Sequence, residues 1–422
     1  MSEKKTILVL SDHPLAPSGV GTQTKNFIET LITTGNYRFI CFGGAIKHQN
    51  YEPQYITDPR WGDKDWVVYP VDGYGSAESI RSILWTEKPD LLWFMTDPRF
   101  YPWLWQIENE VRPLVPMVYY HVWDNYPPPK YNAKWYRSTD VIASISKVTH
   151  DIVSKVAPDV ENHYIPHAVD GNIFRKIEKQ DVKKFMEESF PDHNGRTIFF
   201  WNNRNARRKQ SGTLVSWFNK FAEEVGPENV CLIMHTDPKD PNGQDLHQLI
   251  EDMNMTDGRI ILSSQKLPPT ALSMMYNMAD CTINISDAEG FGLATLESLS
   301  CGTPIIVNMT GGLQEQVTNG EDWFGIGIEP ASKALIGSQA VPYIYEDRIT
   351  EEDFLNALRK IYNMSPEERD SLGLMGAKHV KDNYSFEKFQ KTWIDLVEDV
   401  TNRLGSWSTR KGYKAWEIKE VS

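Results

Sequence analysis

Residues 6–43 read TILVLSDHPLAPSGVGTQTKNFIETLITTGNYRFICFG, and this stretch decides the fold class. A first apolar run, TILVLS, is followed by a polar loop, an amphipathic segment near residues 22–33 and a second apolar run, RFICFG. Two apolar strands joined through a helix are typical of the βαβ unit of a parallel sheet. The chain is therefore expected to be an α/β protein.

The same alternation continues and divides into two series. Further strands of the first series are expected in WVVYP, DLLWFM, PMVYYH, DVIASI and NHYIPH, at residues 66–70, 90–95, 116–121, 140–145 and 162–167. A polar stretch at residues 178–194 is typical of a linker. The second series is expected at 196–201, 229–235, 259–264, 280–286 and 303–308. We expect two doubly wound domains, 1–178 and 190–384, with ligand-binding loops at the carboxyl ends of the strands in a cleft between them.

The composition is that of an acidic globular chain. Its 422 residues include 44 Lys and Arg and 57 Asp and Glu, so the net charge is −13, and 40% are hydrophobic. This balance argues against a surface built for nucleic acid or anionic membranes. The four cysteines lack the spacing of a zinc site, so we expect buried, reduced thiols in a cytoplasmic protein. No apolar run reaches the length of a signal-peptide core or a membrane span, and peripheral membrane contact stays open.

The most informative segment is SDAEGFGLATLE, residues 286–297, directly after the apolar strand CTINI. Glycines at a strand-to-helix turn let backbone amides approach a ligand closely, and a helix N-terminus favours negative charge there. Glu289 precedes the helix and Glu297 lies about two turns inside it, so the pair could hold two hydroxyl groups of one extended ligand. The plainer alternative is a first-turn acid and a solvated helix residue.

A second segment, NNRNARRK at residues 202–209, follows the strand IFFW. Positive charge at the start of a helix is unfavourable because the helix dipole repels it, and a bound anion would remove that conflict. The alternative is a solvated basic turn.

The first domain offers weaker signals. Gly19 and Gly21 stand before a helix and suggest a phosphate or acceptor loop, but a plain turn explains them equally well. The dinucleotide fingerprint is absent, because the third glycine is missing and no acid follows the second strand. His121 and Asp124 follow a strand and are site candidates, although a structural histidine is the more frequent case.

At this point the sequence resembles the retaining nucleotide-sugar transferases of glycosyltransferase family 4, the glycosyl transferases group 1. Glu289 and Glu297 match the E-x7-E signature of that family. Gly302-Thr303-Pro304 and Gly311-Gly312-Leu313-Gln314-Glu315 follow in the order of the family. The resemblance implies the GT-B fold, in which two Rossmann-like domains face a cleft. It also implies that a C-terminal helix and tail, residues 385–422, pack back toward the N-terminal domain.

The resemblance also implies roles for individual residues. Glu289 would hold hydroxyls of the donor sugar, Glu297 would hold the ribose, and Arg204 and Lys209 have the spacing with which the family binds the diphosphate. The expected catalytic residues are Arg204, Lys209, Glu289 and His121. The expected donor-binding residues are Glu297, Gly290, Phe291, Gly292, Leu293, Gly19 and Gly21. Two departures are Asn203, where the family usually has Gly, and the insertion at residues 331–346, which could be a lid or an interface.

The expected activity is retaining transfer of a sugar from a nucleoside diphosphate sugar, such as UDP-glucose or GDP-mannose, to a hydroxyl acceptor of a glycan, a lipid or another molecule. No cofactor and no metal are expected, because Arg204 and Lys209 would stabilise the departing diphosphate. Asp63-Lys64-Asp65 spells the D-x-D of metal-dependent transferases but precedes a strand, so chance explains it better.

Three alternatives stay open. The first is a nucleotide-sugar epimerase or isomerase on the same fold, and the second is a non-catalytic nucleotide-sugar binding protein. The third is glycosylation of modified DNA. The acidic balance disfavours nucleic acid, but a local basic patch could form from residues near the end of the chain, namely Arg403, Arg410, Lys411, Lys414 and Lys419.

Overall fold

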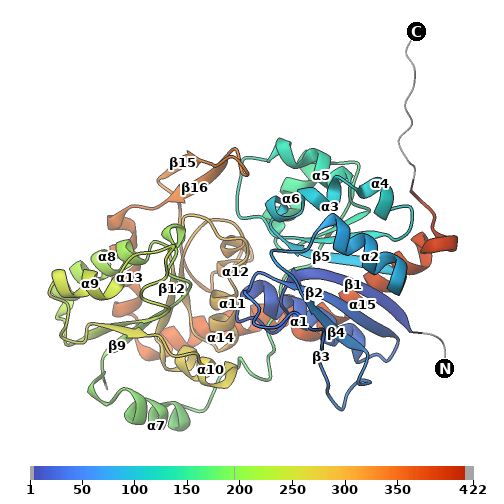
Figure 1. Ribbon diagram of the computed structural model, residues 1–422. Coiled ribbons are helices and arrows are strands. Elements are labelled where there is room, and N and C mark those ends of the chain that lie inside the picture. The colour runs from blue at the N-terminus through green and yellow to red at the C-terminus, as the bar shows by residue number, and fades with distance from the viewer. Residues whose placement is uncertain (1–3, 194, 414–422) are drawn as a thin grey trace. The chain divides into compact units, whose positions relative to one another are not determined.

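A computed structural model describes residues 4–193 and 195–413 of the chain (Figure 1). The chain forms two compact units. The first contains Met1–His167, Ser338–Pro342 and Glu387–Ser422, and the second contains Ala168–Gly337 and Tyr343–Phe386. The first segment of the first unit thus ends at His167, whereas the sequence predicted the domain boundary at residue 178.

The first unit is built on an eight-stranded sheet of order β3-β4-β2-β1-β5-β6-β7-β8. All neighbouring strands are parallel except β3 and β4. The strands are β1 (Lys5–Asp12), β2 (Tyr37–Gly44), β3 (Gln54–Tyr55), β4 (Trp66–Pro70), β5 (Leu91–Thr96), β6 (Met117–His121), β7 (Val141–Ser144) and β8 (Glu161–Tyr164). The helices between them are α1 (Gly19–Ile32), α2 (Ala77–Glu87), α3 (Pro102–Trp105), α4 (Glu108–Val111), α5 (Ala133–Arg137) and α6 (Lys147–Val156).

The long helix α15 (Phe386–Leu404) joins the core of this first unit. Its Trp393 is fully buried and lies edge-on to Phe27 of α1, with ring centroids 4.9 Å apart. Phe27 in turn stacks on Trp93 of β5 at 4.2 Å. Aromatic pairs in these geometries stabilise a core beyond the area they bury. The C-terminal segment is therefore an integral part of the first unit.

The second unit is built on a six-stranded parallel sheet of order β11-β10-β9-β12-β13-β14. Its strands are β9 (Thr197–Asn202), β10 (Val230–His235), β11 (Ile260–Ser263), β12 (Cys281–Asn284), β13 (Ile305–Asn308) and β14 (Gly325–Ile328). Its helices are α7 (Lys179–Ser189), α8 (Ser211–Val225), α9 (Leu246–Asp252), α10 (Pro269–Met278), α11 (Leu293–Ser300), α12 (Leu313–Val317), α13 (Glu351–Asn363) and α14 (Pro366–Asn383). The parallel α/β fold expected from the sequence is confirmed.

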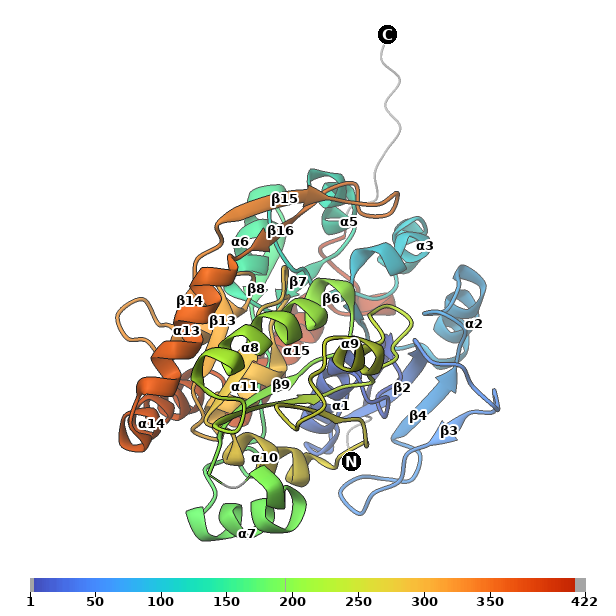
Figure 2. The same ribbon diagram turned by 90° about the vertical axis from the view of Figure 1, so that its left-hand side faces the viewer.

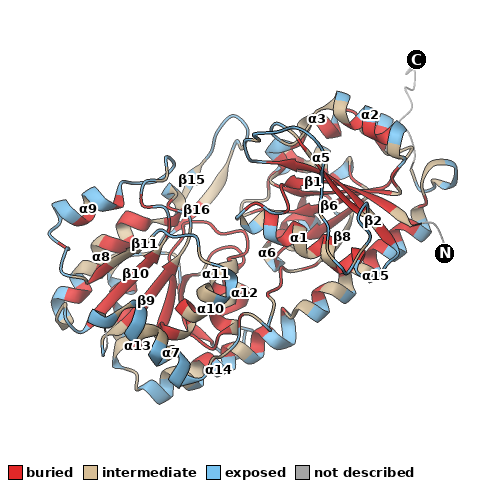
Figure 3. Cartoon of the chain, turned by 60° about the horizontal axis from the view of Figure 1, so that its bottom comes forward, coloured by how far each residue is buried: buried red, intermediate tan, exposed pale blue. Residues whose placement is uncertain are grey.

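Helices cover both faces of this second sheet (Figure 2). On one face, Phe199 and Trp201 of β9 pack into a core shared with α8, α9 and α13. On the other face, Phe200 lies against Tyr276 of α10, with ring centroids 5.2 Å apart. Successive side chains of a strand point to opposite faces, so the continuous apolar run IFFW is explained by a sheet that is buried on both sides. The strands of this sheet are accordingly largely buried, and exposed residues lie on the outer helix faces and in the loops (Figure 3).

Two helices follow the second sheet, α13 and α14, and α14 begins with a capping box between Ser365 and Glu368. The insertion expected at residues 331–346 forms a two-stranded antiparallel hairpin, β15 (Ser332–Ile336) and β16 (Ile344–Arg348). The four cysteines are buried and free, as expected.

Candidate functional site

The loops after β9, β12 and β13 lie at one edge of the second sheet, because the strands are parallel. The loop after β12 ends at Gly292, which adopts φ +91° immediately before α11. A side chain at Gly312, in the loop after β13, would place its Cβ 2.6 Å from the Cα of Phe291. Only glycine tolerates these two positions, one for its left-handed backbone and one for its closeness to the neighbouring loop. The glycines therefore let the two loops pack directly on each other.

Glu289 and Lys209 form a buried ion pair between the loops after β12 and β9. Their side chains are 11% and 9% exposed, and Asn284 donates a second hydrogen bond to the Glu289 carboxylate at 3.3 Å. Burial alone would raise the pKa of Glu289, but the positive charges of Lys209 and Arg208 outweigh it, so the pKa lies below its ordinary value. The structure thus brings together two residues that the sequence places 80 positions apart.

Glu297 lies on α11 and is not the freely solvated residue of the plainer alternative. Tyr276 of α10 donates a hydrogen bond to Glu297 Oε2 at 2.7 Å. The Tyr276 hydroxyl in turn accepts one from Asn202 Nδ2, at the end of β9, at 2.8 Å. Removal of the carboxylate from water raises the pKa of Glu297 to about 7. This carboxyl group therefore changes its charge near neutral pH.

The basic loop after β9 is held by several partners. Arg204 is 63% exposed and makes a forked contact with Asp240, at 2.6 Å from Nε and 3.2 Å from Nη2. The Arg204 guanidinium holds the pKa of Asp240 at about 2. Arg208 donates to the carbonyl of Ala288, and its own carbonyl accepts from the amide of Asp287 at 2.8 Å. The loops after β9 and β12 are therefore joined by backbone as well as by charge.

Gly19 and Gly21, which were expected to bind the sugar donor, lie in the first turn of helix α1 in the first unit. α1 begins at Gly19, and its N-cap Ser18 accepts a hydrogen bond from the amide of Gly21 at 2.9 Å. A Cβ at Gly21 would lie 2.8 Å from the carbonyl oxygen of Ala16. The hydroxyl of Ser18 also donates to Asp12 at 2.6 Å. Close packing within the turn accounts for Gly21, and the phosphate role of Gly19 and Gly21 stays a prediction.

His121 ends β6 in the first unit and is fully buried. Its Nδ1 lies 3.1 Å from the hydroxyl of Tyr119, and its Nε2 lies 2.7 Å from that of Tyr136. Burial lowers the pKa of His121 to about 3, so the ring is neutral at physiological pH. A sugar could reach this ring only if the tyrosines moved, and its proximity to a donor stays a prediction. Asp124 is half-buried.

The structure adds no support for a metal site or for a basic patch near the end of the described chain. Within residues 4–193 and 195–413, no group of three or more His, Cys, Asp or Glu is arranged to hold a metal ion. Arg403 pairs with Glu161, and the buried Arg410 pairs with Asp140 at 2.9 Å. Lys414 and Lys419 lie outside the described residues. None of the helices that the structure describes combines the length and the apolar character of a membrane span.

The sequence reading missed several residues around this edge. Asp240 stands in the loop after β10, and its position after a parallel strand was a signal that could have found it. Tyr276 lies inside an apolar helix pattern, where it looks like a core residue. Glu346 lies in the insertion, whose pairing with the basic loop has no signal in a single sequence.

The comparisons with known proteins agree with this geometry. A family model described as Glycosyl transferases group 1 matches residues 181–361. N-acetyl-alpha-D-glucosaminyl L-malate synthase of Bacillus anthracis is 24% identical over 244 residues, which cover 55% of this chain and 57% of that protein. The chain thus spans little more than half of that relative.

Two solved structures share the fold. Sucrose-phosphate synthase from Thermosynechococcus elongatus has a TM-score of 0.74 at 16% identity, and the match covers 95% of this chain and 100% of that one. Anabaena Alr3699/HepE in complex with UDP-glucose has a TM-score of 0.68 at 13% identity, covering 93% of this chain and 99% of that one. Residues 181–361 thus match the glycosyl transferases group 1 model, and the chain has the GT-B fold of glycosyltransferases.

Proposed function

We propose that the protein is a retaining glycosyltransferase that moves a sugar from a nucleoside diphosphate sugar to a hydroxyl acceptor without a metal ion. The observation that carries this proposal is the buried Lys209–Glu289 pair, which joins two loops at the carboxyl edge of the second sheet. Ligands of open α/β sheets bind at this edge. The UDP-glucose in the Anabaena neighbour supports a donor of the same class.

The charges at this edge suit a departing diphosphate. Breaking the bond between the anomeric carbon and the phosphate oxygen leaves positive character on the sugar and negative charge on the diphosphate. Lys209 is fixed by Glu289 and cannot swing into solvent without leaving a buried carboxylate unpaired. Arg204 is exposed and would exchange Asp240 for a phosphate oxygen. The two cations would therefore supply the charge that a divalent ion supplies elsewhere.

Glu289 and Glu297 are proposed to bind hydroxyl groups of the donor, Glu289 on the sugar and Glu297 on the ribose. An ionised carboxylate accepts hydrogen bonds from hydroxyls, and such charge-assisted bonds are about twice as strong as neutral ones. The backbone amides of residues 290–293 would face the sugar and the diphosphate. A phosphate oxygen would take the proton of the acceptor, so no side-chain base is assigned.

A donor panel with purified protein tests the proposal. UDP-, GDP-, ADP- and dTDP-sugars are incubated with glycan and lipid acceptors in EDTA, and the anomeric configuration of the product is read by NMR. We expect release of nucleoside diphosphate and an α-linked product from an α-configured donor. A β-linked product would overturn the retaining assignment, and a strict requirement for added divalent metal would overturn metal independence.

The same assay separates the alternatives. Donor incubated without acceptor gives an isomeric nucleotide sugar if the protein is an epimerase or isomerase. A protein that binds the donor and turns over none of it with any acceptor is a binding protein. Modified DNA is included among the acceptors, and its glycosylation would assign that acceptor.

A further inference from the structure

The hairpin β15–β16 follows β14 in the chain and contains the insertion by which the sequence departs from the family pattern; Figure 1 shows its two strands side by side. Its second strand returns to the sheet and carries two acidic side chains that are almost fully buried. Glu346 is 1% exposed and Asp347 is 3% exposed. Buried acids are costly unless charge or hydrogen bonds compensate for the lost water. Their partners therefore show what this strand is built to hold.

Glu346 holds the loop after β9. Its carboxylate accepts hydrogen bonds from Nη1 and Nη2 of Arg207. The bond from Nη1 is 3.1 Å long. Arg348 donates a further bond to Glu346 at 2.8 Å and lies 3.7 Å from Asp287. Arg207 stands between Arg204 and Lys209 in the sequence, so a fixed Arg207 limits where those two cations can lie.

Asp347 holds the other two loops. Its backbone amide donates to the carbonyl of Asp287 at 2.7 Å, in the loop after β12. Its carboxylate accepts from the hydroxyl of Thr310 at 2.8 Å, and its carbonyl accepts from Asn308 Nδ2 at 2.7 Å. Asn308 also donates to the carbonyl of Ser286 at 2.9 Å. One residue of β16 is thus bonded to the loops after β12 and β13 together.

We propose that Glu346 and Asp347 are positioning residues of the donor site, which fix the loops after β9, β12 and β13 relative to one another. The inference rests on the proposed function, because it assigns these loops to a nucleoside diphosphate sugar. The two residues touch no reacting atom. They act through Arg207 and through the backbone that carries Glu289.

The mechanism is geometric. The three loops come from separate strands, so only non-covalent contacts set the spacing between Lys209 on one loop and Glu289 with the amides near Gly292 on another. A displacement of about 1 Å in a catalytic group can cost about 10²-fold in rate. Together with the Lys209–Glu289 pair and the backbone bond between Asp287 and Arg208, the acidic pair of β16 restricts this freedom before the donor arrives.

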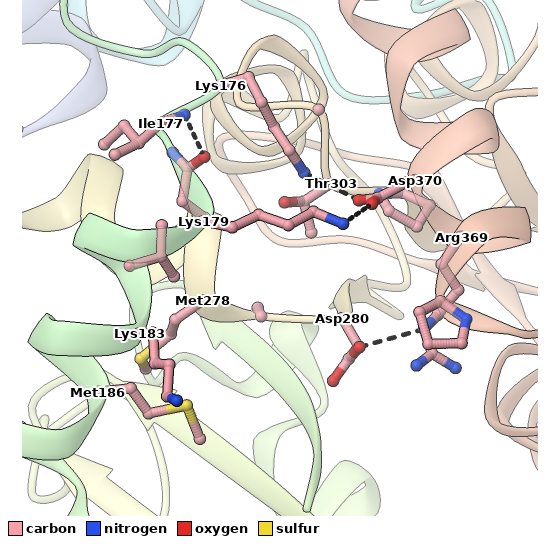
Figure 4. Close-up of a pocket in the computed structure, with 16 residues that line it drawn as sticks. Lys176, Ile177, Lys179, Lys183, Met186, Met278, Asp280, Thr303, Arg369 and Asp370 are labelled. Atoms are coloured by element: carbon pink, nitrogen blue, oxygen red, sulfur yellow. Dashed lines mark hydrogen bonds and ion pairs between the residues drawn. The ribbon is translucent and has the colours of Figure 1, made fainter. Parts of the chain in front are cut away.

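Glu346→Gln and Asp347→Asn test the proposal, because each keeps the shape of the side chain and removes its charge. Asp280→Asn is the matched control. Asp280 pairs with Arg369 at 3.1 Å and accepts from the amide of Ile198 at 2.8 Å, at the opposite, amino-terminal edge of the same sheet. Figure 4 shows this pair in the wall of a cavity of about 270 Å³ that is also lined by Lys176 and Thr303.

Three measurements are made on the full chain. They are the melting temperature, amide hydrogen exchange of residues 205–210 and 285–293 without ligand, and the affinity for UDP and GDP. We expect faster exchange in both loops and an affinity at least about tenfold lower in the two β16 variants. Asp280→Asn is expected to lower the melting temperature and to leave loop exchange and nucleotide affinity as in the wild type.

Unchanged loop exchange in both β16 variants would overturn the positioning role, whatever happens to the melting temperature. If neither UDP nor GDP binds the wild-type protein, these two donors are excluded, and hydrogen exchange still decides whether β16 orders the loops. If exchange rises over the whole chain in every variant, control included, the two acids are general contributors to stability and the proposal fails.

Discussion

Lys209 and Glu289 pair with each other across two loops of the second sheet, and both side chains are about nine-tenths buried. One follows β9 and the other precedes α11, so the pair forms only when the sheet is assembled. A buried pair of opposite charges costs desolvation on both sides, and loss of one partner leaves the other uncompensated. The pair is therefore both a structural contact and the chemical centre of the proposed site.

Lys209→Met is expected to destabilise the protein by about 3–5 kcal/mol, because it leaves the Glu289 carboxylate buried without its cation. The double variant with Glu289→Gln should recover much of this loss, since no buried charge then remains. Urea denaturation of the two variants measures the difference. Equal stability of the single and double variants would contradict an energetic coupling between the residues.

Arg204→Ala is expected to lower turnover by about 10²–10³-fold while changing the melting temperature little. The rate effect follows from the loss of a charge aimed at the departing diphosphate. The small effect on stability follows from the exposure of Arg204, since exposed ion pairs contribute little. Asp240→Asn serves as the comparison, because it removes the competing carboxylate and should leave donor affinity equal or higher. A rate unchanged by Arg204→Ala would remove this residue from the site.

Nucleotide affinity is expected to rise with pH through about 7, because the pKa of Glu297 is raised to about 7 and its carboxylate is the proposed ribose ligand. Glu297→Gln should lose this part of the pH dependence, and any titration that survives in it belongs to the nucleotide. Calorimetry of UDP and GDP binding at pH 6 and pH 8 makes the comparison. Identical pH profiles for the wild type and Glu297→Gln would contradict the assignment.

Glu297 also affects stability, and the sign is fixed by its raised pKa. The folded protein binds this proton more tightly than the unfolded chain, so the contribution is complete below the ordinary pKa of 4.5 and is lost as the pH rises toward 7. Glu297→Gln should therefore gain stability relative to the wild type between pH 5 and pH 8. A stability difference that does not change with pH would show that the carboxyl group is not perturbed.

His121→Asn is expected to lower the melting temperature, because the hydroxyls of Tyr119 and Tyr136 lose a buried partner. Since the pKa of His121 is lowered to about 3, the stability it contributes is present above about pH 6.5 and is lost as the pH falls toward 3. Thermal unfolding at several pH values measures this. A fall in turnover with no fall in melting temperature would instead support the predicted role beside the donor sugar.

The fold could be predicted because its signals are local. Apolar runs such as TILVLS and IFFW mark strands that are buried on both faces, and Ser365 with Glu368 marks a helix start. The order of the strands within each sheet could not be predicted, because it depends on contacts between residues far apart in the chain. β14 and the β15–β16 hairpin were not expected as strands for the same reason.

The site could be predicted as a set of residues but not as a set of contacts. Glu289 and Lys209 were chosen for separate parts of the donor, and the structure pairs them with each other. Arg204 was chosen for a phosphate, and its present partner is Asp240. The sequence shows which residue types, and therefore which chemistry, stand in each loop. Which side chains contact one another depends on how the sheet brings the loops together.

The donor site is tested most directly by calorimetry of UDP, GDP, ADP and dTDP binding in EDTA, with the wild-type protein and Arg204→Ala side by side. Saturable binding of at least one nucleoside diphosphate to the wild type, weakened about 10²-fold or more by Arg204→Ala, is the expected result. Absence of binding for every nucleotide, or equal binding to both proteins, would contradict the proposal that these loops hold a nucleoside diphosphate sugar without a metal ion.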